Sequence, residues 1–150
     1  MENVIVDNKY HNAKYLKASD PLYPCNAAEE KYKETCYLMQ TSYMLTVVNG
    51  DFNRVFDLCA SAEESHRNTC YQSLGRDASG RSTSNVAQTV AWCNLGRDSS
   101  QRENCVTGAV KDFISYFHSD TQAKELCAAF DDPEVKDTCS RAGEAYYKIF

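Results

Sequence analysis

Apolar residues recur along this chain at the three- and four-residue intervals of an amphipathic α-helix. The clearest stripe runs from Val106 to Phe117, where apolar side chains are separated by four, three, one and three residues. Similar stripes lie within 32–47, 52–59 and 123–130. Only three prolines and six glycines interrupt a sequence of 150 residues. The pattern therefore predicts a chain that is helical almost throughout.

The stripes and the breaks between them predict eight helices. Sequence signals for helix starts support two of the boundaries. Asp132 is a capping residue followed by proline, and Ser100 has Glu103 three positions later. Residues 76–84 are polar and contain glycine and serine, so we expect a surface loop there. The expected helices cover residues 9–18, 26–48, 51–60, 66–75, 84–95, 100–117, 120–130 and 133–149.

Cysteine adds a second, longer period. The eight cysteines are separated by 11, 23, 11, 23, 12, 22 and 12 residues. Each short step plus the long step after it comes to 34 residues, a period typical of helical-hairpin repeats. We therefore expect four units, each with a helix A and a helix B joined by a short turn. The cysteines are Cys25, Cys36, Cys59, Cys70, Cys93, Cys105, Cys127 and Cys139.

A four-residue motif repeats together with the cysteines. It ends at the second cysteine of each unit and reads basic, then acidic or amide, then Thr or Asn, then Cys. Another shared tetrapeptide, Leu-Gly-Arg-Asp at 74–77 and 95–98, falls at different distances from the cysteines, and we interpret it as a reused helix stop or a coincidence. The four copies of the repeated motif occupy residues 33–36, 67–70, 102–105 and 136–139.

Two disulfide schemes are compatible with antiparallel hairpins. Pairing across the long gaps would leave Cys25 and Cys139 unpaired, whereas pairing within each unit uses all eight cysteines. We expect the second scheme, in which each bridge closes a loop of about a dozen residues and contributes roughly 2–3 kcal/mol. The expected pairs are Cys25–Cys36, Cys59–Cys70, Cys93–Cys105 and Cys127–Cys139.

The cysteine spacing also bears on metal binding and on the compartment. Structural zinc sites use close cysteine pairs, and redox sites use Cys-x-x-Cys; neither pattern occurs in this sequence. Bound metal and reactive thiols are therefore the less favoured interpretations. Because disulfides persist in oxidising compartments, we expect an extracytoplasmic protein: periplasmic, on the cell surface or secreted.

Charge and hydropathy narrow the range of partners. The net charge of −5 and a pI near 5.2 argue against nucleic acid and anionic membrane surfaces. No apolar run approaches the roughly 20 residues of a membrane-spanning helix.

The first residues lack the features of a secretory leader, so we expect a mature or excised domain. Residues 1–150 form one expected domain, and 1–24 form an irregular N-terminal cap because Asp20–Pro24 breaks the helical pattern.

Arginine and tyrosine supply the candidate partner-binding residues. Four arginines make the middle of this acidic chain locally basic, and arginine binds carboxylates and phosphates in a bidentate manner. Tyrosine is enriched at interface cores. The alternatives are solvated arginines and tyrosines that pack on the terminal hairpins. The candidates are Arg76, Arg81, Arg97, Arg102, Tyr10, Tyr15 and Tyr23.

Catalytic chemistry finds little support in the sequence. The three histidines, His11, His66 and His118, fall at expected turns or helix edges, where we interpret them as surface or capping residues. The carboxylates within 131–137 suit the first turn of a helix better than a calcium loop. No Gly-x-Ser-x-Gly nucleophile elbow occurs. We therefore expect a protein that is not an enzyme and that needs no metal or cofactor.

The 34-residue period with paired cysteines, over about residues 25–139, resembles disulfide-stapled helical-repeat proteins of the tetratricopeptide-like and Sel1-like kind. The consensus Trp, Gly, Tyr and Ala positions of the tetratricopeptide repeat are not present. The resemblance implies an all-α fold of four stapled hairpins, stacked as a short right-handed solenoid or a compact bundle. It also implies a surface that binds a protein or peptide partner. The alternative is a carrier in which the aromatic stripes enclose a small apolar ligand.

Overall fold

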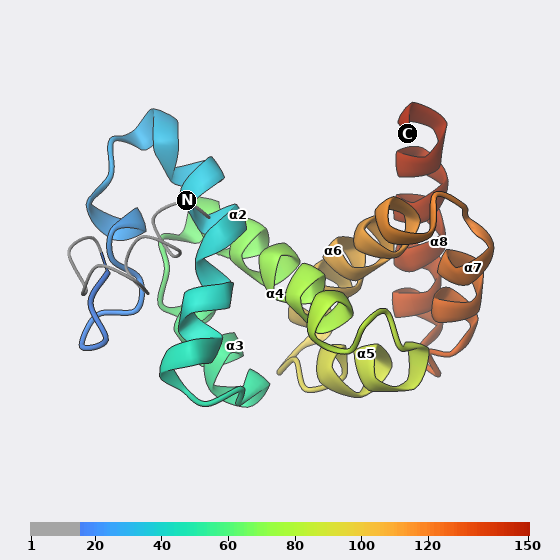
Figure 1. The fold of residues 1–150 in the computed structure, drawn as a ribbon, viewed down its shortest axis with the longest axis horizontal. Coiled ribbons are helices and arrows are strands. Elements are labelled where there is room, and N and C mark those ends of the chain that lie inside the picture. The colour runs from blue at the N-terminus through green and yellow to red at the C-terminus, as the bar shows by residue number, and fades with distance from the viewer. Residues whose placement is uncertain (1–15) are drawn as a thin grey trace.

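The structure is a computed structural model, and it describes residues 16–150. This part of the chain is all-α, and its one bridge of β type joins Lys17 to Asp20. Short and long helices alternate along the chain (Figure 1). The elements are η1 (Cys25–Ala27), α2 (Glu30–Val47), α3 (Phe52–Ala60), η2 (Glu64–His66), α4 (Arg67–Arg81), α5 (Val86–Cys93), α6 (Ser99–Phe117), α7 (Thr121–Ala128) and α8 (Pro133–Ile149).

Four disulfides join helix A to helix B within each unit, as the cysteine spacing predicts. The A elements are η1, α3, α5 and α7, and the B helices are α2, α4, α6 and α8. The paired Cα atoms lie 5.4 or 5.5 Å apart, and all eight cysteines are buried and bonded. Four intrachain disulfides indicate an oxidising, extracytoplasmic environment. The bridges are Cys25–Cys36, Cys59–Cys70, Cys93–Cys105 and Cys127–Cys139.

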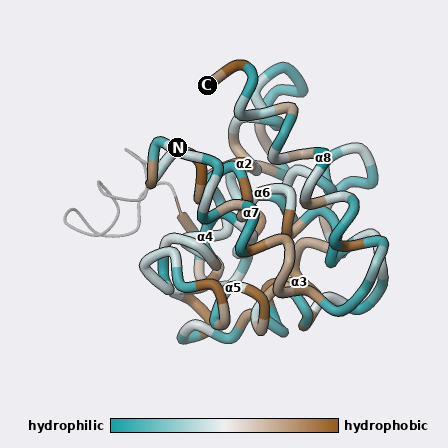
Figure 2. Tube along the Cα trace, turned by 90° about the vertical axis from the view of Figure 1, so that its right-hand side faces the viewer, coloured by the Kyte–Doolittle hydropathy of each residue, from teal (hydrophilic) through white to brown (hydrophobic). Residues whose placement is uncertain are grey.

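The main interfaces join B helices of consecutive units. α2 packs on α4, α4 on α6 and α6 on α8, with the short A helices along the side of the row. Figure 1 shows α2 and α8 toward opposite ends, with α4 and α6 between them. One continuous cluster of buried apolar side chains runs through all four units. Figure 2 shows the hydrophobic C-terminal tip, where Ile149 is 81% exposed, protruding from the molecule.

Two glycines allow α4 and α6 to cross with their backbones in contact. A Cβ atom at Gly75 would lie 1.7 Å from the carbonyl oxygen of Cys105, and one at Gly108 would lie 1.8 Å from that of Gln72. No side chain larger than hydrogen fits at either position. Gly75 is therefore a packing glycine inside α4, and our interpretation of its tetrapeptide as a helix stop is wrong for this copy.

The expected loop at 76–84 is also wrong for most of its length. α4 continues to Arg81 because its buried face continues: Ala78 and Ser79 are fully buried beyond Gly75. The turn itself is short, and Thr83 and Ser84 adopt positive φ values of 57° and 56° there. The polar composition of this segment has two causes. Asp77 accepts hydrogen bonds from α2, as described below. Ser79 and Ser82 instead bond to Ser84 and Thr89 around the turn into α5.

The first expected helices also differ from the structure. Residues 16–18, the described end of the expected helix 9–18, are not helical. The expected helix 26–48 is divided, because η1 ends at Ala27 and α2 begins only at Glu30. The side chain of Asn26 donates to Asp20 at 3.1 Å and does not cap a helix. Residues 16–24 form turns and one β-type bridge, and their role as a cap remains a prediction.

Aspartates and an asparagine begin four of the later helices. Asp132 accepts a hydrogen bond from the backbone of Glu134, as its place before proline predicts. Asp98, rather than the expected Ser100, caps α6 and starts that helix one residue earlier than predicted. Asp51 and Asn85 cap α3 and α5 in the same way. Each cap satisfies a backbone N–H that would otherwise lack a partner.

The repeated four-residue motif connects one unit to the next. Thr69 of unit 2 donates to Glu34 of unit 1 at 2.5 Å, and Thr138 of unit 4 donates to Glu103 of unit 3. Between units 2 and 3, where the motif has Asn104, that side chain accepts from Gln72 at 2.9 Å. In units 2 to 4 the Thr or Asn therefore pairs with the preceding unit.

Candidate functional site

A groove runs across the B helices on the side away from the A helices. We call it the B-helix groove; its volume is about 410 Å³. All four B helices contribute to its wall, so it exists only because the four units are stacked. Its residues are Leu38, Met39, Gln72, Ser73, Arg76, Gly108, Lys111, Asp112, Ser115 and Tyr146.

Arg76 is the charged residue whose position in the groove is best defined. Its guanidinium donates to Met39 Sδ at 2.9 Å and to Ser42 Oγ at 3.5 Å, and it lies 3.7 Å from Asp77 Oδ1. One third of its side chain stays exposed. The contacts hold the guanidinium against α2 while one side remains open to a ligand.

Asp77 lies beneath Arg76 between α2 and α4. Its carboxylate accepts hydrogen bonds from Thr41 at 2.5 Å and Ser42 at 2.8 Å, and Ser73 lies 2.6 Å from Thr41. Burial in this interface raises the pKa of Asp77, because desolvation disfavours its charged form more than these hydrogen bonds favour it. The network orders the α2–α4 interface and supports the Arg76 side of the groove.

Apolar surface lies on both sides of the charged part of the groove. Leu38 on α2 is 42% exposed. Tyr146 on α8 is half-buried, and its hydroxyl lies 2.8 Å from Ser115 Oγ. Lys111 on α6 adds a second cation, and the neighbouring Asp112 adds one carboxylate. The groove thus offers apolar contacts, two cations and one anion.

The structure brings only one of the four candidate arginines into the groove. Arg97 instead binds Asn53 at 2.9 Å and Asp57 at 3.2 Å, which ties α3 to the turn before α6. Arg102 donates to the Gly96 carbonyl at 2.9 Å and so stabilises the turn of its own unit. Arg81 is exposed in the last turn of α4. The four arginines therefore do not form one patch, although binding roles for them remain predictions.

The candidate tyrosines lie near the N-terminal cap. Tyr23 is half-buried, and the ammonium of Lys17 lies 4.2 Å from its ring centroid. Tyr10 and Tyr15 lie outside the described residues. Several groove residues, among them Leu38 and Lys111, were not predicted from the sequence.

The repeat spacing contains a signal for Lys111, because Arg76 and Lys111 both fall six residues after the second cysteine of their units.

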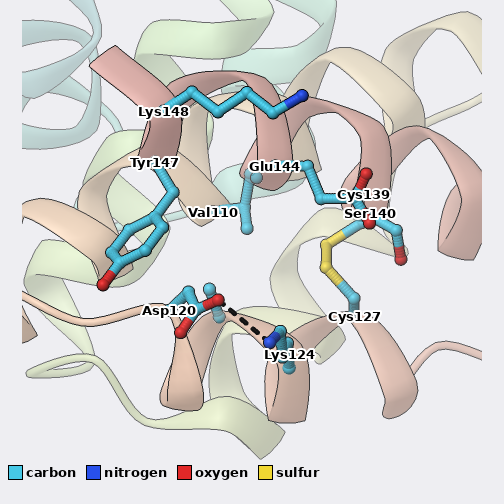
Figure 3. Close-up of a pocket in the computed structure, with 11 residues that line it drawn as sticks. Val110, Asp120, Lys124, Cys127, Cys139, Ser140, Glu144, Tyr147 and Lys148 are labelled. Carbon is cyan, nitrogen blue, oxygen red and sulfur yellow. Dashed lines mark ion pairs between the residues drawn. A yellow bond between two sulfur atoms is a disulfide. The ribbon is translucent and has the colours of Figure 1, made fainter. Parts of the chain in front are cut away.

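A separate pocket lies inside the terminal hairpin, between α7, α8 and the edge of α6 (Figure 3). Its volume is about 280 Å³, and its walls include Val110, Ala123 and Gly143. In Figure 3 Tyr147 bounds one side and the Cys127–Cys139 disulfide the other. Asp120 and Lys124 form an ion pair of 3.0 Å at the rim, and this hydrogen bond raises the pKa of Lys124.

His66 is not the surface residue that the sequence suggested. It is 6% exposed, stacks on Tyr37, and places Nε2 2.8 Å from Glu30 and Nδ1 3.2 Å from Glu34. The hydrogen bond to Glu30 is the largest cause of a raised pKa for His66, and burial opposes it. Both ring nitrogens are therefore occupied by carboxylates from α2. His66 connects units 1 and 2 and does not face either cavity.

Neither the other histidine in the described part nor the acidic cluster forms a site. His118 ends α6 in a left-handed conformation, with φ at 53°. In the cluster at the start of α8, Asp132 caps the helix and Asp137, within it, pairs with Arg141 at 2.8 Å. Across residues 16–150, no group of three or more His, Cys, Asp or Glu side chains is arranged to hold a metal ion.

Comparisons with protein-family models, curated proteins and solved structures found no match to this chain. The resemblance to tetratricopeptide-like and Sel1-like repeats thus remains an expectation from spacing. Over the described residues, no helix has the length and apolar character to cross a membrane.

Proposed function

We propose that this protein is a non-enzymatic interaction module that binds an extended segment of a partner protein along the B-helix groove. The observation that supports the proposal most directly is the position of Arg76, held at the groove by α2 and still one-third exposed. An arginine fixed in this way loses little side-chain freedom when it binds a carboxylate.

Charge favours an acidic segment. The chain carries a net charge of −5, yet the residues that line the groove include two cations and one anion, while Asp77 lies beneath Arg76 and outside the lining. A segment with carboxylates opposite Arg76 and Lys111, and apolar side chains over Leu38 and Tyr146, complements this pattern. Stacked helical repeats commonly present such extended surfaces to partners. Packing between consecutive B helices holds the groove walls together, and each disulfide fixes a B helix to the A element of its own unit.

The alternative of a carrier with an aromatic-lined cavity has less support. The aromatic stripes pack into the core: Phe52, Phe56 and Phe113 are at most 1% exposed, and none of them lines the groove or the terminal pocket. A small-ligand role would therefore have to rest on the terminal pocket alone.

A selection from a random 12-residue peptide library tests the proposal. We expect enrichment of peptides that combine Asp or Glu with Leu, Phe or Tyr. Purified peptides should bind R76E at least about 10-fold more weakly, because like charges then face each other. The matched control is R141E, which reverses an exposed arginine on the outer side of α8. No enrichment, or peptides that bind R76E and the original protein equally, would contradict the proposal.

A further inference from the structure

The disulfides allow the four hairpins to be compared position by position. In each unit, the residue four places before the first cysteine corresponds to one side of the hairpin, and the residue four places after the second cysteine corresponds to the other. In unit 1 the two positions meet, because Gln40 donates to the carbonyl of Pro21 at 2.8 Å. The four pairs are Pro21 and Gln40, Val55 and Leu74, Thr89 and Ala109, and Ala123 and Gly143.

The last pair is the smallest. In unit 2, Val55 and Leu74 are both fully buried and contribute two branched aliphatic side chains to the core. In unit 4, Ala123 and Gly143 are also buried but contribute only a methyl group and a hydrogen atom. The terminal pocket lies beside these two residues. At Gly143 an added Cβ atom would lie 3.2 Å from Val110 Cγ2, so α6 packs closely there. The pocket therefore corresponds to the Ala123 side of the pair, where unit 2 carries Val55.

A second position widens the same pocket. The residue directly after the second cysteine is Tyr37, Tyr71 or Val106 in the first three units, and each of them is buried. In unit 4 this residue is Ser140, which is exposed and lines the pocket. The small residues of unit 4 thus combine to leave an opening of about 280 Å³. This volume is near the lower end of the range for small-molecule sites, roughly 300–1,000 Å³.

The rim of the pocket is charged but balanced. Asp120 and Lys124 on α7 form one pair of opposite charges, and Glu144 and Lys148 on α8 add another carboxylate and ammonium. Figure 3 shows the α7 pair along one edge and Lys148 across the opening from it. A ligand with a single charge would be attracted by one member of each pair and repelled by the other. A zwitterion can oppose a carboxylate and an ammonium at once.

We propose that the terminal pocket binds a free aliphatic amino acid, with its branched side chain beside Ala123 and its ammonium and carboxylate at the charged rim. The apolar walls match the side chain in size and character, and the rim matches the head group. The site is independent of the B-helix groove, because no residue lines both.

The test uses L-leucine as the probe and follows backbone amide signals of the intact, oxidised protein by NMR. We expect saturable shifts confined to α7, α8 and the Val110 region, with a dissociation constant on the order of 1 mM, as for other ligands of this size. Leucine without its amine (4-methylpentanoate) and leucine without its carboxylate (3-methylbutylamine) should bind more weakly. Equal binding of all three probes would overturn the zwitterion assignment.

Two variants locate the site. A123V introduces the residue that unit 2 carries at the equivalent position and should weaken leucine binding by about 10-fold or more. A128V adds the same methyl groups on the exposed side of α7 and should leave binding unchanged. K124Q changes only the exposed rim, so it reports on the head group even if A123V is poorly folded; K136Q is its control on α8. The proposal is wrong if leucine gives no saturable shift up to about 10 mM or if A123V and K124Q bind it normally.

Discussion

The α2–α4 and α4–α6 interfaces join helices that hold the same place in consecutive units, yet they are built differently. The α2–α4 interface is largely polar. Asp77 accepts hydrogen bonds from Thr41 and Ser42 across it, and His66 binds Glu30. The α4–α6 interface is formed by direct backbone contact, and there is no room for a Cβ atom at Gly75 or Gly108. One repeat period can therefore be satisfied by two kinds of packing, with different sensitivity to mutation and pH.

The largest effect is expected where the backbones touch. G108A places a methyl group against the carbonyl of Gln72, and since that backbone cannot move without displacing α4, we expect a loss of about 3 kcal/mol in the free energy of unfolding. Chemical denaturation with the disulfides intact measures it. G80A is the control, because Gly80 lies in α4, the helix that Gly108 touches, with nothing within 4 Å of an added Cβ atom, and alanine there should add roughly 0.5–1 kcal/mol. Similar stabilities for both variants would contradict the close crossing.

A smaller effect is expected at the polar interface. D77A removes the acceptor for two hydroxyl groups in a largely buried place, which should lower the free energy of unfolding by about 2 kcal/mol. D57A removes an exposed carboxylate that pairs with Arg97, and it should cost about 0.5 kcal/mol or less. If D77A is no more destabilising than D57A, the Asp77 network does not hold α2 on α4.

The cysteine rhythm predicted the part of the fold that depends on regular spacing. Pairing within units follows from a period that all eight cysteines obey, and the helical stripes follow from apolar residues that face one core. Asp132 before Pro133 also predicted a helix start, because capping is a local interaction. These features share one property: the residues that determine them lie close together in the sequence or repeat at a fixed interval.

The features that the sequence did not predict depend on contacts between units. In the sequence Gly75 looks like a helix stop, because the contact that requires glycine is made with the backbone of Cys105, 30 residues away. The polar segment after it looks like a loop because the partners of Asp77, Thr41 and Ser42, lie on α2, about 35 residues earlier in the chain. His66 looks like a surface residue because its partners, Glu30 and Glu34, are on α2. The groove was missed for the same reason, since four helices contribute to it.

The smallest expected effect distinguishes the two interfaces by pH. Burial alone would raise the pKa of Glu63, but hydrogen bonds from Lys33 and Tyr37 lower it to about 2. Its contribution to stability is therefore present above the ordinary value of 4.5 and is lost as pH falls toward 2. The pKa of His66 is raised, so its contribution is complete below the ordinary value of 6.5 and is lost as pH rises through the folded value.

Together these groups give the contact between α2 and the η2 segment directly before α4 a window, between about pH 4.5 and 6.5, in which both contributions are present. In the original protein the free energy of unfolding should decline as pH rises above this window, and we expect H66Q to remove that decline. The change in the free energy of unfolding should be less than about 1 kcal/mol, because Glu30 and Glu34 are largely exposed. H118N is the control, since asparagine tolerates the left-handed conformation of His118. Amide hydrogen exchange resolves the site of the effect: protection in α2 should fall as pH rises, after correction for the intrinsic exchange rate, while protection at the α4–α6 crossing stays constant. If amide protection at both interfaces changes equally with pH, or if the pH dependence in α2 persists in H66Q, then His66 does not stabilise the contact between units 1 and 2.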